Sequence, residues 1–263
     1  MNDLVTYQRE RNAAILTLNR PEKRNALSLA MIDAISARLH EAQHDPSVRS
    51  LILTGAGPAF CAGMDLDELR ASLDREDHPF EADALKLSAL FDQLYHLAKP
   101  TIAAVNGAAV AGGCGLVTVC DLALATPDAK LGYPEVHRGL VAAMVMPHLL
   151  RHVGERTARW LLLTGELLDG MDALRHGLVN DITTEAHLLT QALAWSDRLA
   201  AGGPDALAAT KQLLARLTMP PVSSEDLAQA SARPRRSTEC QAGLQAFFAK
   251  QPPPWQRDRP ATN

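Results

Sequence analysis

Two stretches of the sequence share one arrangement, in which a short apolar run is followed by a glycine turn and then by the start of a helix. The longer stretch, Thr101 to Asp121, reads TIAAVNGAAVAGGCGLVTVCD, with a turn signal at Asn106-Gly107 and a glycine pair at Gly112-Gly113. The other begins with the apolar run LILTG at 51–55 and continues through AFCAGMDL at 59–66. Each stretch predicts a buried strand that runs into a turn and then into a helix.

This arrangement suits the binding of a developing negative charge. Glycine allows a backbone N–H to come close to a bound group, and the first N–H groups of a helix are unpaired and carry the positive end of its dipole. Two such turns aimed at one point would form an oxyanion hole, in which each donor is worth roughly 3–4 kcal/mol of barrier. Taken singly, either stretch is better explained as a plain turn after a strand.

The composition describes a chain that folds without disulfides. Its 263 residues are 47% hydrophobic, which is enough for one core with a small appended unit. The four cysteines form no CxxC pair, and three lie in apolar runs, so reduced thiols and a cytoplasmic location are predicted. The first residues lack a secretory pattern, and no apolar stretch reaches membrane-spanning length. The formal charge of −4 and the scattered basic residues predict no nucleic-acid partner.

Strands alternate with helices in the first two thirds of the chain, and helices alone follow, which predicts an α/β fold with an α-helical extension. A helix is expected after Ser28 as its N-cap, ending near Asp45-Pro46. The charged segment from Leu66 to Pro79 reads as a solvated loop. Further strands are expected at 13–18, 101–105, 122–125 and 129–131, and further helices at 81–98, 144–153, 156–163, 188–199, 205–217 and 236–248.

The sequence HEAQH at 40–44 matches the HExxH zinc pattern. Its histidines fall in the last turn before Pro46, away from the apolar face of the helix, and no third ligand follows. A solvated helix end is therefore the preferred interpretation, and no metal is predicted.

As a set, several motifs resemble those of the enoyl-CoA hydratase/isomerase family, the crotonases, in order and in spacing. They are NRPEKRNAL at 19–27, FCAGMDL at 60–66, VNG at 105–107 with GGC at 112–114, CD at 120–121 and PE at 134–135, with LTGE at 163–166, GLV at 177–179 and FFAK at 247–250 as later matches. The resemblance covers nearly the whole chain. It implies a crotonase-like spiral of ββα turns at 1–200, carrying the acyl-CoA site, and a C-terminal helical oligomerisation region at 201–263. It also implies homotrimers or homohexamers and a place in fatty acid metabolism.

The resemblance implies enolate chemistry on an acyl-CoA thioester. Matched residue by residue, the two oxyanion donors are the backbone N–H groups of Met64 and Gly112, and the acid/base is Glu135. Family hydratases carry a second glutamate earlier in the chain, but its position here is Gly115, and no acidic residue lies between Gly107 and Val119. Should Glu135 not be the base, the next candidates are Asp67, Glu68 and His137, of which His137 is expected to be structural or exposed, on the other face of a strand-like segment.

The missing glutamate leaves several reactions open. One carboxylate suffices to isomerise a 3-enoyl-CoA to a 2-enoyl-CoA, and ordinary 2-enoyl-CoA hydration is retained as a near equal. Hydroxycinnamoyl-CoA hydratase-lyases have a similar pattern, whereas Ala143 disfavours dienoyl-CoA isomerases and dehalogenases, which carry a carboxylate there. A decarboxylase, a hydrolase or an acyl-CoA-binding protein without chemistry are the alternatives on the same scaffold.

The family also implies where CoA binds. The adenine is expected near the turns at 23–27 and 62–66, and basic side chains near its phosphates. The matching candidates are Lys23, Arg24, Ala26, Ala62, Asp65, Leu66 and Lys250, with Lys250 reaching a neighbouring subunit's site. Exposed lysines and arginines are more often only solvated charges. Coenzyme A enters as part of the substrate, so no separate cofactor is predicted.

Overall fold

The computed structural model describes residues 3–73, 75, 79–218 and 223–257. Its strands are β1 (Val5–Glu10), β2 (Ala13–Leu18), β3 (Ser50–Gly55), β4 (Ala59–Cys61), β5 (Thr101–Val105), β6 (Ala108–Val110), β7 (Leu122–Ala125), β8 (Leu131–Gly132), β9 (Leu167–Leu168) and β10 (Asp181–Ile182). Its α-helices are α1 (Leu29–His44), α2 (Leu66–Leu73), α3 (Phe80–Tyr95), α4 (Gly112–Val119), α5 (Met146–Thr164), α6 (Gly170–Arg175), α7 (Glu185–Ala200), α8 (Pro204–Thr218), α9 (Ser224–Ala232), α10 (Thr238–Phe248) and α11 (Pro254–Arg257). Short 3-10 helices are η1 (Pro21–Lys23), η2 (Pro134–Arg138), η3 (Ala143–Val145) and η4 (Arg233–Arg236).

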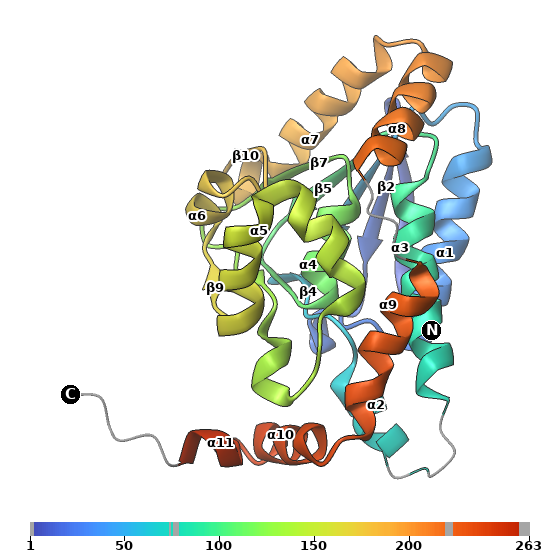
Figure 1. Cartoon of the computed structure of the whole chain (residues 1–263). Helices are drawn as coiled ribbons and strands as arrows, with labels where there is room; N and C mark the ends of the chain where they lie inside the picture. The colour runs from blue at the N-terminus through green and yellow to red at the C-terminus, as the bar shows by residue number, and fades with distance from the viewer. Residues whose placement is uncertain (1–2, 74, 76–78, 219–222, 258–263) are drawn as a thin grey trace.

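The strands form two sheets that the chain visits in turn (Figure 1). The larger sheet has the order β1-β2-β3-β5-β7-β10, and the smaller one has the order β4-β6-β8-β9. All neighbours are parallel except β1 with β2 and β8 with β9. Each of β3, β5 and β7 is followed by one strand of the smaller sheet and then by a helix or 3-10 helix. This repetition confirms the expected spiral of ββα turns.

Both faces of the larger sheet are buried. The side chains of β2 point alternately into two hydrophobic clusters, one on each face. Leu16 and Leu18 join the main core beneath α1 and α3, whereas Ile15 points into a second cluster with Leu188 and Leu193 of α7. Because successive side chains of a strand point to opposite faces, one six-residue strand serves both clusters. Full burial of each such side chain stabilises the folded state by roughly 1.5–3 kcal/mol. The two packed faces therefore hold the sheet firmly in position.

Several local predictions are confirmed. The strand at 13–18 has the expected bounds, and the Ser28 hydroxyl accepts a hydrogen bond from the Met31 amide at 3.1 Å, as an N-cap should. The two helices expected on either side of Gly154 form α5, which Gly154 interrupts with a φ of 70°. All four cysteines are free and buried.

Two predictions need correction. The segment expected to be a solvated loop begins with a helix, α2, because Asp65 Oδ1 accepts hydrogen bonds from the amides of Asp67 and Glu68 and so caps it. The part of that prediction at 74 and 76–78 lies outside the described residues. The segment around Glu135 is also no strand but the 3-10 helix η2, started by Pro134.

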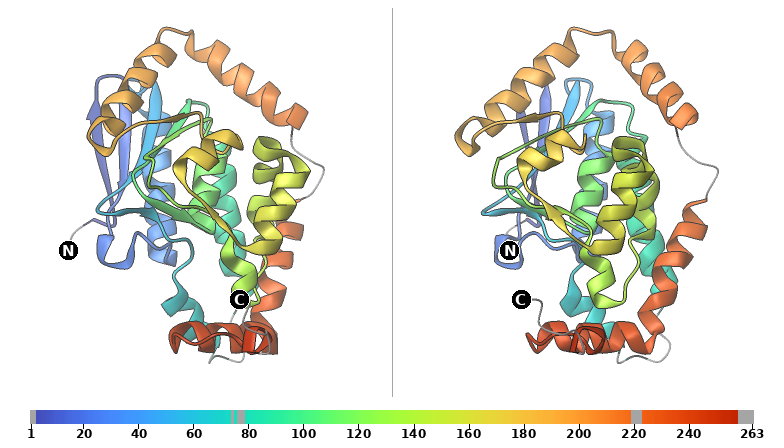
Figure 2. Two further views of the ribbon diagram at one scale, coloured as in Figure 1. Left: turned by 90° about the vertical axis from the view of Figure 1, so that its left-hand side faces the viewer. Right: turned by 60° about the vertical axis from the view of Figure 1, so that its left-hand side comes forward.

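The C-terminal helices surround the spiral at three places. Figure 2 shows α7 and α8 arching over one end of the molecule, with α10 and α11 at the opposite end. The boundary predicted near 200–204 falls in the turn between α7 and α8. Between those two ends, α9 packs along α3. In the part of the chain that is described, no helix has both the length and the apolar character that crossing a bilayer requires.

Candidate active site

Three of the predicted site residues follow three neighbouring strands of the smaller sheet. Met64 comes shortly after β4, Gly112 directly after β6, and Glu135 shortly after β8. Cys61 in β4 pairs with Ala109 in β6, and Val110 in β6 pairs with Gly132 in β8. Because these strands are parallel, their carboxyl ends lie at one edge of the sheet, where ligands of α/β proteins typically bind.

The turns after β4 and β6 touch each other at a glycine. Gly63 has a φ of 84°, and a Cβ added to it would lie only 2.8 Å from both the Ala111 Cβ and the Val110 carbonyl oxygen. Only glycine therefore fits there. On the other side of the contact, Ala111 has a φ of 54° with a ψ of −125°, a conformation that costs a non-glycine residue about 1–3 kcal/mol. The chain thus accepts strain in order to begin α4 at this point.

The backbone amides of Met64 and Gly112 are held in place, but neither N–H donates a hydrogen bond within the described residues. Around Met64, the Leu27 amide donates to the Gly63 carbonyl oxygen at 2.7 Å, and the Asp65 amide donates to the Leu27 carbonyl oxygen at 3.0 Å. Within the described residues, no acceptor receives a hydrogen bond from the N–H of Met64 or Gly112, and both residues line the same cavity. Two fixed donors, one of them at a helix N-terminus, are what a negatively charged oxygen requires.

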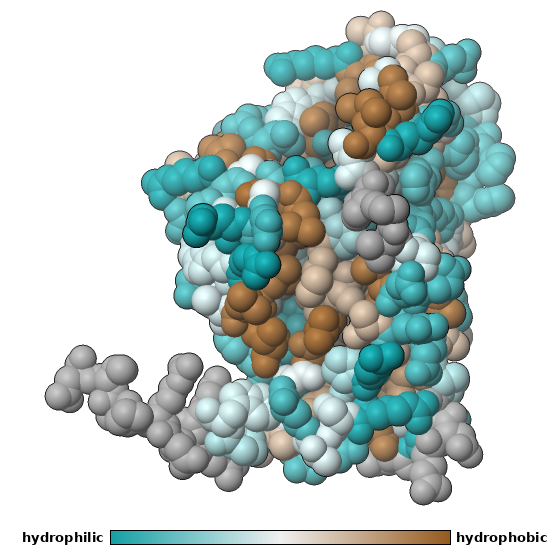
Figure 3. Space-filling model, viewed as in Figure 1, coloured by the Kyte–Doolittle hydropathy of each residue, from teal (hydrophilic) through white to brown (hydrophobic). Residues whose placement is uncertain are grey.

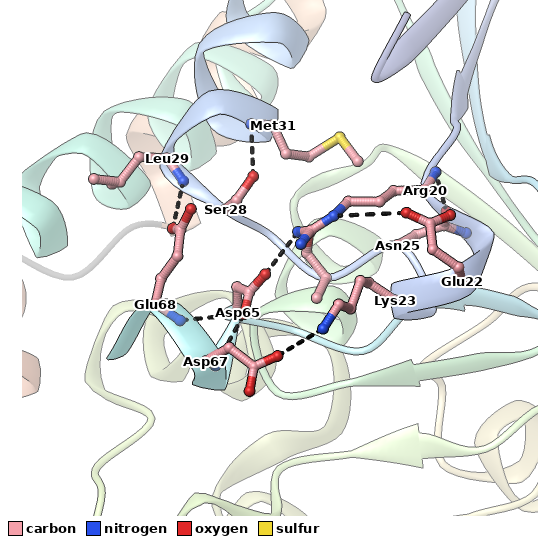
Figure 4. A network of polar contacts seen from close by, with 11 residues as sticks. Arg20, Glu22, Lys23, Asn25, Ser28, Leu29, Met31, Asp65, Asp67 and Glu68 are labelled. Atoms are coloured by element: carbon pink, nitrogen blue, oxygen red, sulfur yellow. Dashed lines mark hydrogen bonds and ion pairs between the residues drawn. The ribbon is translucent and has the colours of Figure 1, made fainter. Parts of the chain in front are cut away.

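A buried carboxylate braces the turn that carries Met64. Figure 4 shows Asp65 between the guanidinium of Arg20 and the start of α2. Arg20 Nη1 donates to Asp65 Oδ2 at 2.7 Å, and Asp65 Oδ1 accepts from the amide of Asp67 at 2.9 Å. Burial opposes ionisation of Asp65, but these hydrogen bonds outweigh it and lower its pKa. The ion pair thereby ties η1, the Met64 turn and α2 together.

The Glu135 carboxylate has one oxygen without a hydrogen-bond partner in the described structure. Its Oε2 atom is buried, and no hydrogen-bond donor of the described residues reaches it. Burial raises the pKa of Glu135 to about 7, although its own backbone amide and the nearby Arg138 cation partly offset the effect. A carboxylate with a pKa close to neutral can both take up and release a proton at physiological pH.

One cavity is lined by Met64, Gly112 and Glu135 together. Six of the seven predicted CoA-binding residues line it together with Met64, Gly112 and Glu135, namely Lys23, Arg24, Ala26, Ala62, Asp65 and Leu66. Lys250, at the end of α10, is exposed and is not among the residues that line it. Lys23 is paired with Asp67 at 2.7 Å at the cavity wall. The remaining wall is largely apolar, with Leu87, Phe91, Met144 and Val145.

The position of the missing glutamate is filled by apolar side chains. A Cβ added to Gly115 would lie 2.4 Å from Val145 Cγ1 and 2.9 Å from Phe91 Cζ. A larger residue at 115 would therefore force those side chains to move. The absence of a second carboxylate is thus built into the packing of this wall.

The other candidates for acid/base or metal chemistry lie differently. His137 is exposed, and its Nε2 lies 2.7 Å from the Thr164 carbonyl oxygen, which agrees with a structural role. Glu68 accepts a hydrogen bond from the Leu29 amide at 3.0 Å. His44 Nδ1 lies 2.8 Å from the His40 carbonyl oxygen, and the described residues contain no cluster of three potential metal ligands.

Two arginines of the cavity wall were not singled out from the sequence. Arg138 lies over the Phe247 ring at 4.4 Å and donates to the Pro134 carbonyl oxygen at 3.2 Å. Arg235 is 2% exposed and lines the same cavity. Its burial could have been suspected from its spacing to Ala228, Ser231 and Ala232, which are also buried and lie at helical intervals.

Comparisons with known proteins show what the chain is similar to. The family described as "Enoyl-CoA hydratase/isomerase" matches residues 8–258. A Thermus thermophilus protein with the provisional name enoyl-CoA hydratase is 42% identical over 246 residues, which cover 92% of this chain and 96% of that protein. The short-chain-enoyl-CoA hydratase of Clostridium acetobutylicum is 33% identical and is covered to 81%, as is this chain. The crystal structure of an enoyl-CoA hydratase from Mycobacterium avium superimposes with a TM-score of 0.82 at 32% identity, covering 97% of this chain and 100% of that one.

Proposed function

Because the chain belongs to the enoyl-CoA hydratase/isomerase family, we propose that it moves protons on an enoyl-CoA thioester with Glu135 as its single acid/base. The observation that supports this most is the buried Glu135 Oε2 atom, which has no hydrogen-bond partner among the described residues and lies in the cavity that Met64 and Gly112 also line. The other described carboxylates of that cavity have cationic partners, since Asp65 pairs with Arg20 and Asp67 pairs with Lys23.

The preferred reaction is the isomerisation of a 3-enoyl-CoA to a 2-enoyl-CoA. Glu135 takes a proton from the α-carbon, and the electron pair of that C–H bond spreads over the thioester and the double bond. The amides of Met64 and Gly112 stabilise the charge that develops on the thioester oxygen. Glu135 then returns the proton to the γ-carbon, which leaves the double bond between the α- and β-carbons. No group other than the CoA of the substrate is needed.

Hydration of a 2-enoyl-CoA is the second candidate, and the names of the relatives favour it. In that reaction Glu135 would protonate the α-carbon while water adds to the β-carbon and gives up one proton to a base. The wall at Gly115 argues against it, because Val145 and Phe91 offer no base to activate the water. We therefore rank hydration second.

A panel of substrates in deuterated water tests this proposal. The protein is incubated with matched 3-enoyl, 2-enoyl and hydroxycinnamoyl thioesters, and the products are identified by mass spectrometry. We expect the 3-enoyl thioester to yield the 2-enoyl isomer, with deuterium incorporated at the γ-carbon, to which Glu135 returns the proton. Fast hydration of the 2-enoyl thioester with no isomerisation would reverse the ranking. Binding without any turnover would favour a non-catalytic acyl-CoA-binding protein, and release of CoA or carbon dioxide would favour a hydrolase or a decarboxylase.

We also propose that the protein works as a homotrimer or homohexamer in the cytoplasm. The support for assembly is on α8, where Leu213, Leu214 and Leu217 are 55%, 55% and 73% exposed. Hydrophobic residues gather over this helix in Figure 3. Leucines this exposed on one helix are typical of an interface. The free, buried cysteines suit a reducing compartment.

A further inference from the structure

Arg235 is a buried cation with very few contacts to satisfy it. It lies in η4, between α9 and α10, and only 2% of it is exposed. Of its five N–H donors, only one makes a hydrogen bond in the described structure, from Nη2 to Ser231 Oγ at a long 3.4 Å. None of the described carboxylates forms an ion pair with it.

Buried guanidinium groups are normally paired with an anion, because removing a charge from water is unfavourable unless another charge replaces the water. Three acidic side chains line a cavity together with Arg235, namely Asp65, Glu68 and Asp83, and the first two have other roles. Asp65 is paired with Arg20 at 2.7 Å, and Glu68 accepts from the Leu29 amide at 3.0 Å. Burial lowers the pKa of Arg235, and the neighbouring acidic groups, Asp83 first among them, offset this only in part. The site therefore contains a buried cation whose charge no carboxylate of the described residues balances in an ion pair, so an anionic ligand could bind there.

The cavities place this cation beside the path of the acyl group. Arg235 lines the main cavity and also an adjoining one next to α2 and α3, and Met64 and Leu87 line both. A Cβ added to Gly112 would lie 3.8 Å from Leu87 Cδ2, so Leu87 is next to the proposed oxyanion donors. An acyl chain whose carbonyl is bound at Gly112 would pass Leu87 and come within reach of Arg235.

We propose that Arg235 binds a carboxylate at the far end of the acyl group, so that the preferred substrates are CoA thioesters of dicarboxylic acids. A guanidinium holds a carboxylate through two parallel hydrogen bonds, which gives both affinity and orientation. This inference rests on the proposed function only in assuming that the cavity takes an acyl-CoA. The phosphates of CoA are the other possible source of the anion, and the test below separates the two sources.

Binding of unreactive ligands tests the inference without relying on turnover. Dissociation constants are measured by calorimetry for succinyl-, glutaryl- and adipyl-CoA, each against its monocarboxylic counterpart, butyryl-, pentanoyl- and hexanoyl-CoA. We expect at least one dicarboxylic thioester to bind about tenfold or more tightly than its counterpart. The absence of any such preference at every length would overturn the inference, even if the enzyme turns over enoyl thioesters. Conversely, a preference without turnover would support the inference and count against the proposed reaction.

Two arginine variants assign the preference to a residue. Arg235→Met should abolish it, whereas Arg233→Met, an exposed neighbour in the same 3-10 helix, should preserve it. If Arg235→Met weakens both members of a pair by the same factor, Arg235 binds a CoA phosphate and the assignment is wrong. A preference that survives Arg235→Met also contradicts it. Arg235→Gln, which keeps polar donors, replaces the methionine variant if the latter unfolds.

Discussion

The cavity joins two regions that are built in opposite ways. At the ends of β4 and β6, the turns are fixed by hydrogen bonds, by the Arg20–Asp65 ion pair and by a glycine contact, and their proposed function resides in the backbone. At the end of β8, the proposed function of Glu135 resides in a side chain whose buried Oε2 atom has no hydrogen-bond partner among the described residues. The first region gains stability from the same contacts that shape it. The second is expected to lower stability for the sake of its chemistry.

The largest effect is expected from Glu135→Gln, which removes the unpartnered acid. Activity should fall by roughly a hundred- to ten-thousandfold, the usual contribution of a general acid–base group. The pKa of Glu135 is raised from 4.5 to about 7 in the folded protein, so its stabilising contribution is present below pH 4.5 and is lost as pH rises through 7. Above pH 7 the variant should therefore be more stable than the wild type, by up to about 3 kcal/mol.

Urea unfolding at several pH values, together with steady-state kinetics, checks this prediction. Glu185→Gln, an exposed glutamate at the start of α7, serves as the control and should change neither quantity. Retained activity in Glu135→Gln would move the base to another residue. A loss of stability at high pH would show that the carboxylate is satisfied after all.

A side chain at Gly112 should impair the other region without unfolding it. A Cβ there would meet Leu27 Cδ1 at 3.5 Å and Leu87 Cδ2 at 3.8 Å, which are ordinary contacts. Gly112→Val would nevertheless crowd the approach to the amide, and kcat should fall by about a hundred- to a thousandfold, as when one oxyanion donor is lost. Gly203→Val is the matched control, because a Cβ there meets only Ala206 Cβ at 3.8 Å. Full turnover by Gly112→Val, with a native circular dichroism spectrum, would disprove the assignment.

Asp65→Ala should have the opposite effect on stability from Glu135→Gln. It leaves the largely buried Arg20 without its partner and removes the cap of α2, so unfolding should become easier by roughly 2–4 kcal/mol. Because Asp65 only braces the Met64 turn, we expect kcat to fall less than in Gly112→Val. Denaturant midpoints measured beside those of Glu135→Gln give a direct comparison. Equal shifts of the two denaturant midpoints in the same direction would contradict the proposed difference between the two regions.

The smallest effect concerns the pH dependence of the reaction. Proton abstraction requires ionised Glu135, so kcat/KM should rise with pH through about 7. Arg138 lowers the pKa of Glu135, and Arg138→Met should therefore move this midpoint upward by up to about one pH unit. Arg156→Met, an exposed arginine of α5, should leave the midpoint in place. A downward shift would contradict the charge arrangement described for this wall.

The sequence revealed the backbone part of the site better than the side-chain part. Glycine pairs, Ser28 as a cap and apolar runs are local signals, so β2, β3, β5, β7, α1 and the turns at Gly63 and Gly112 could be predicted closely, whereas β1, β9 and β10 were not predicted. The helix α2 was missed, because its cap depends on Asp65, which is held by an arginine distant in sequence. The burial of Arg235 has only a weak local signal in its spacing to Ala228, Ser231 and Ala232, and the closed wall at Gly115 depends on contacts with Phe91 and Val145, which lie far from it in the chain.

The contact between Gly63 and Ala111 also limits how this catalyst can diversify. No further atom fits between the two turns. The two backbone amides proposed to bind the thioester oxygen therefore cannot change their spacing or direction unless both strands also move. New acyl groups would have to be accommodated by exchanging Leu87, Phe91 or Val145, whose side chains come from other parts of the chain. Substrate range would then vary through substitutions in the apolar wall, while the residues of the Gly63 and Ala111 turns stay unchanged.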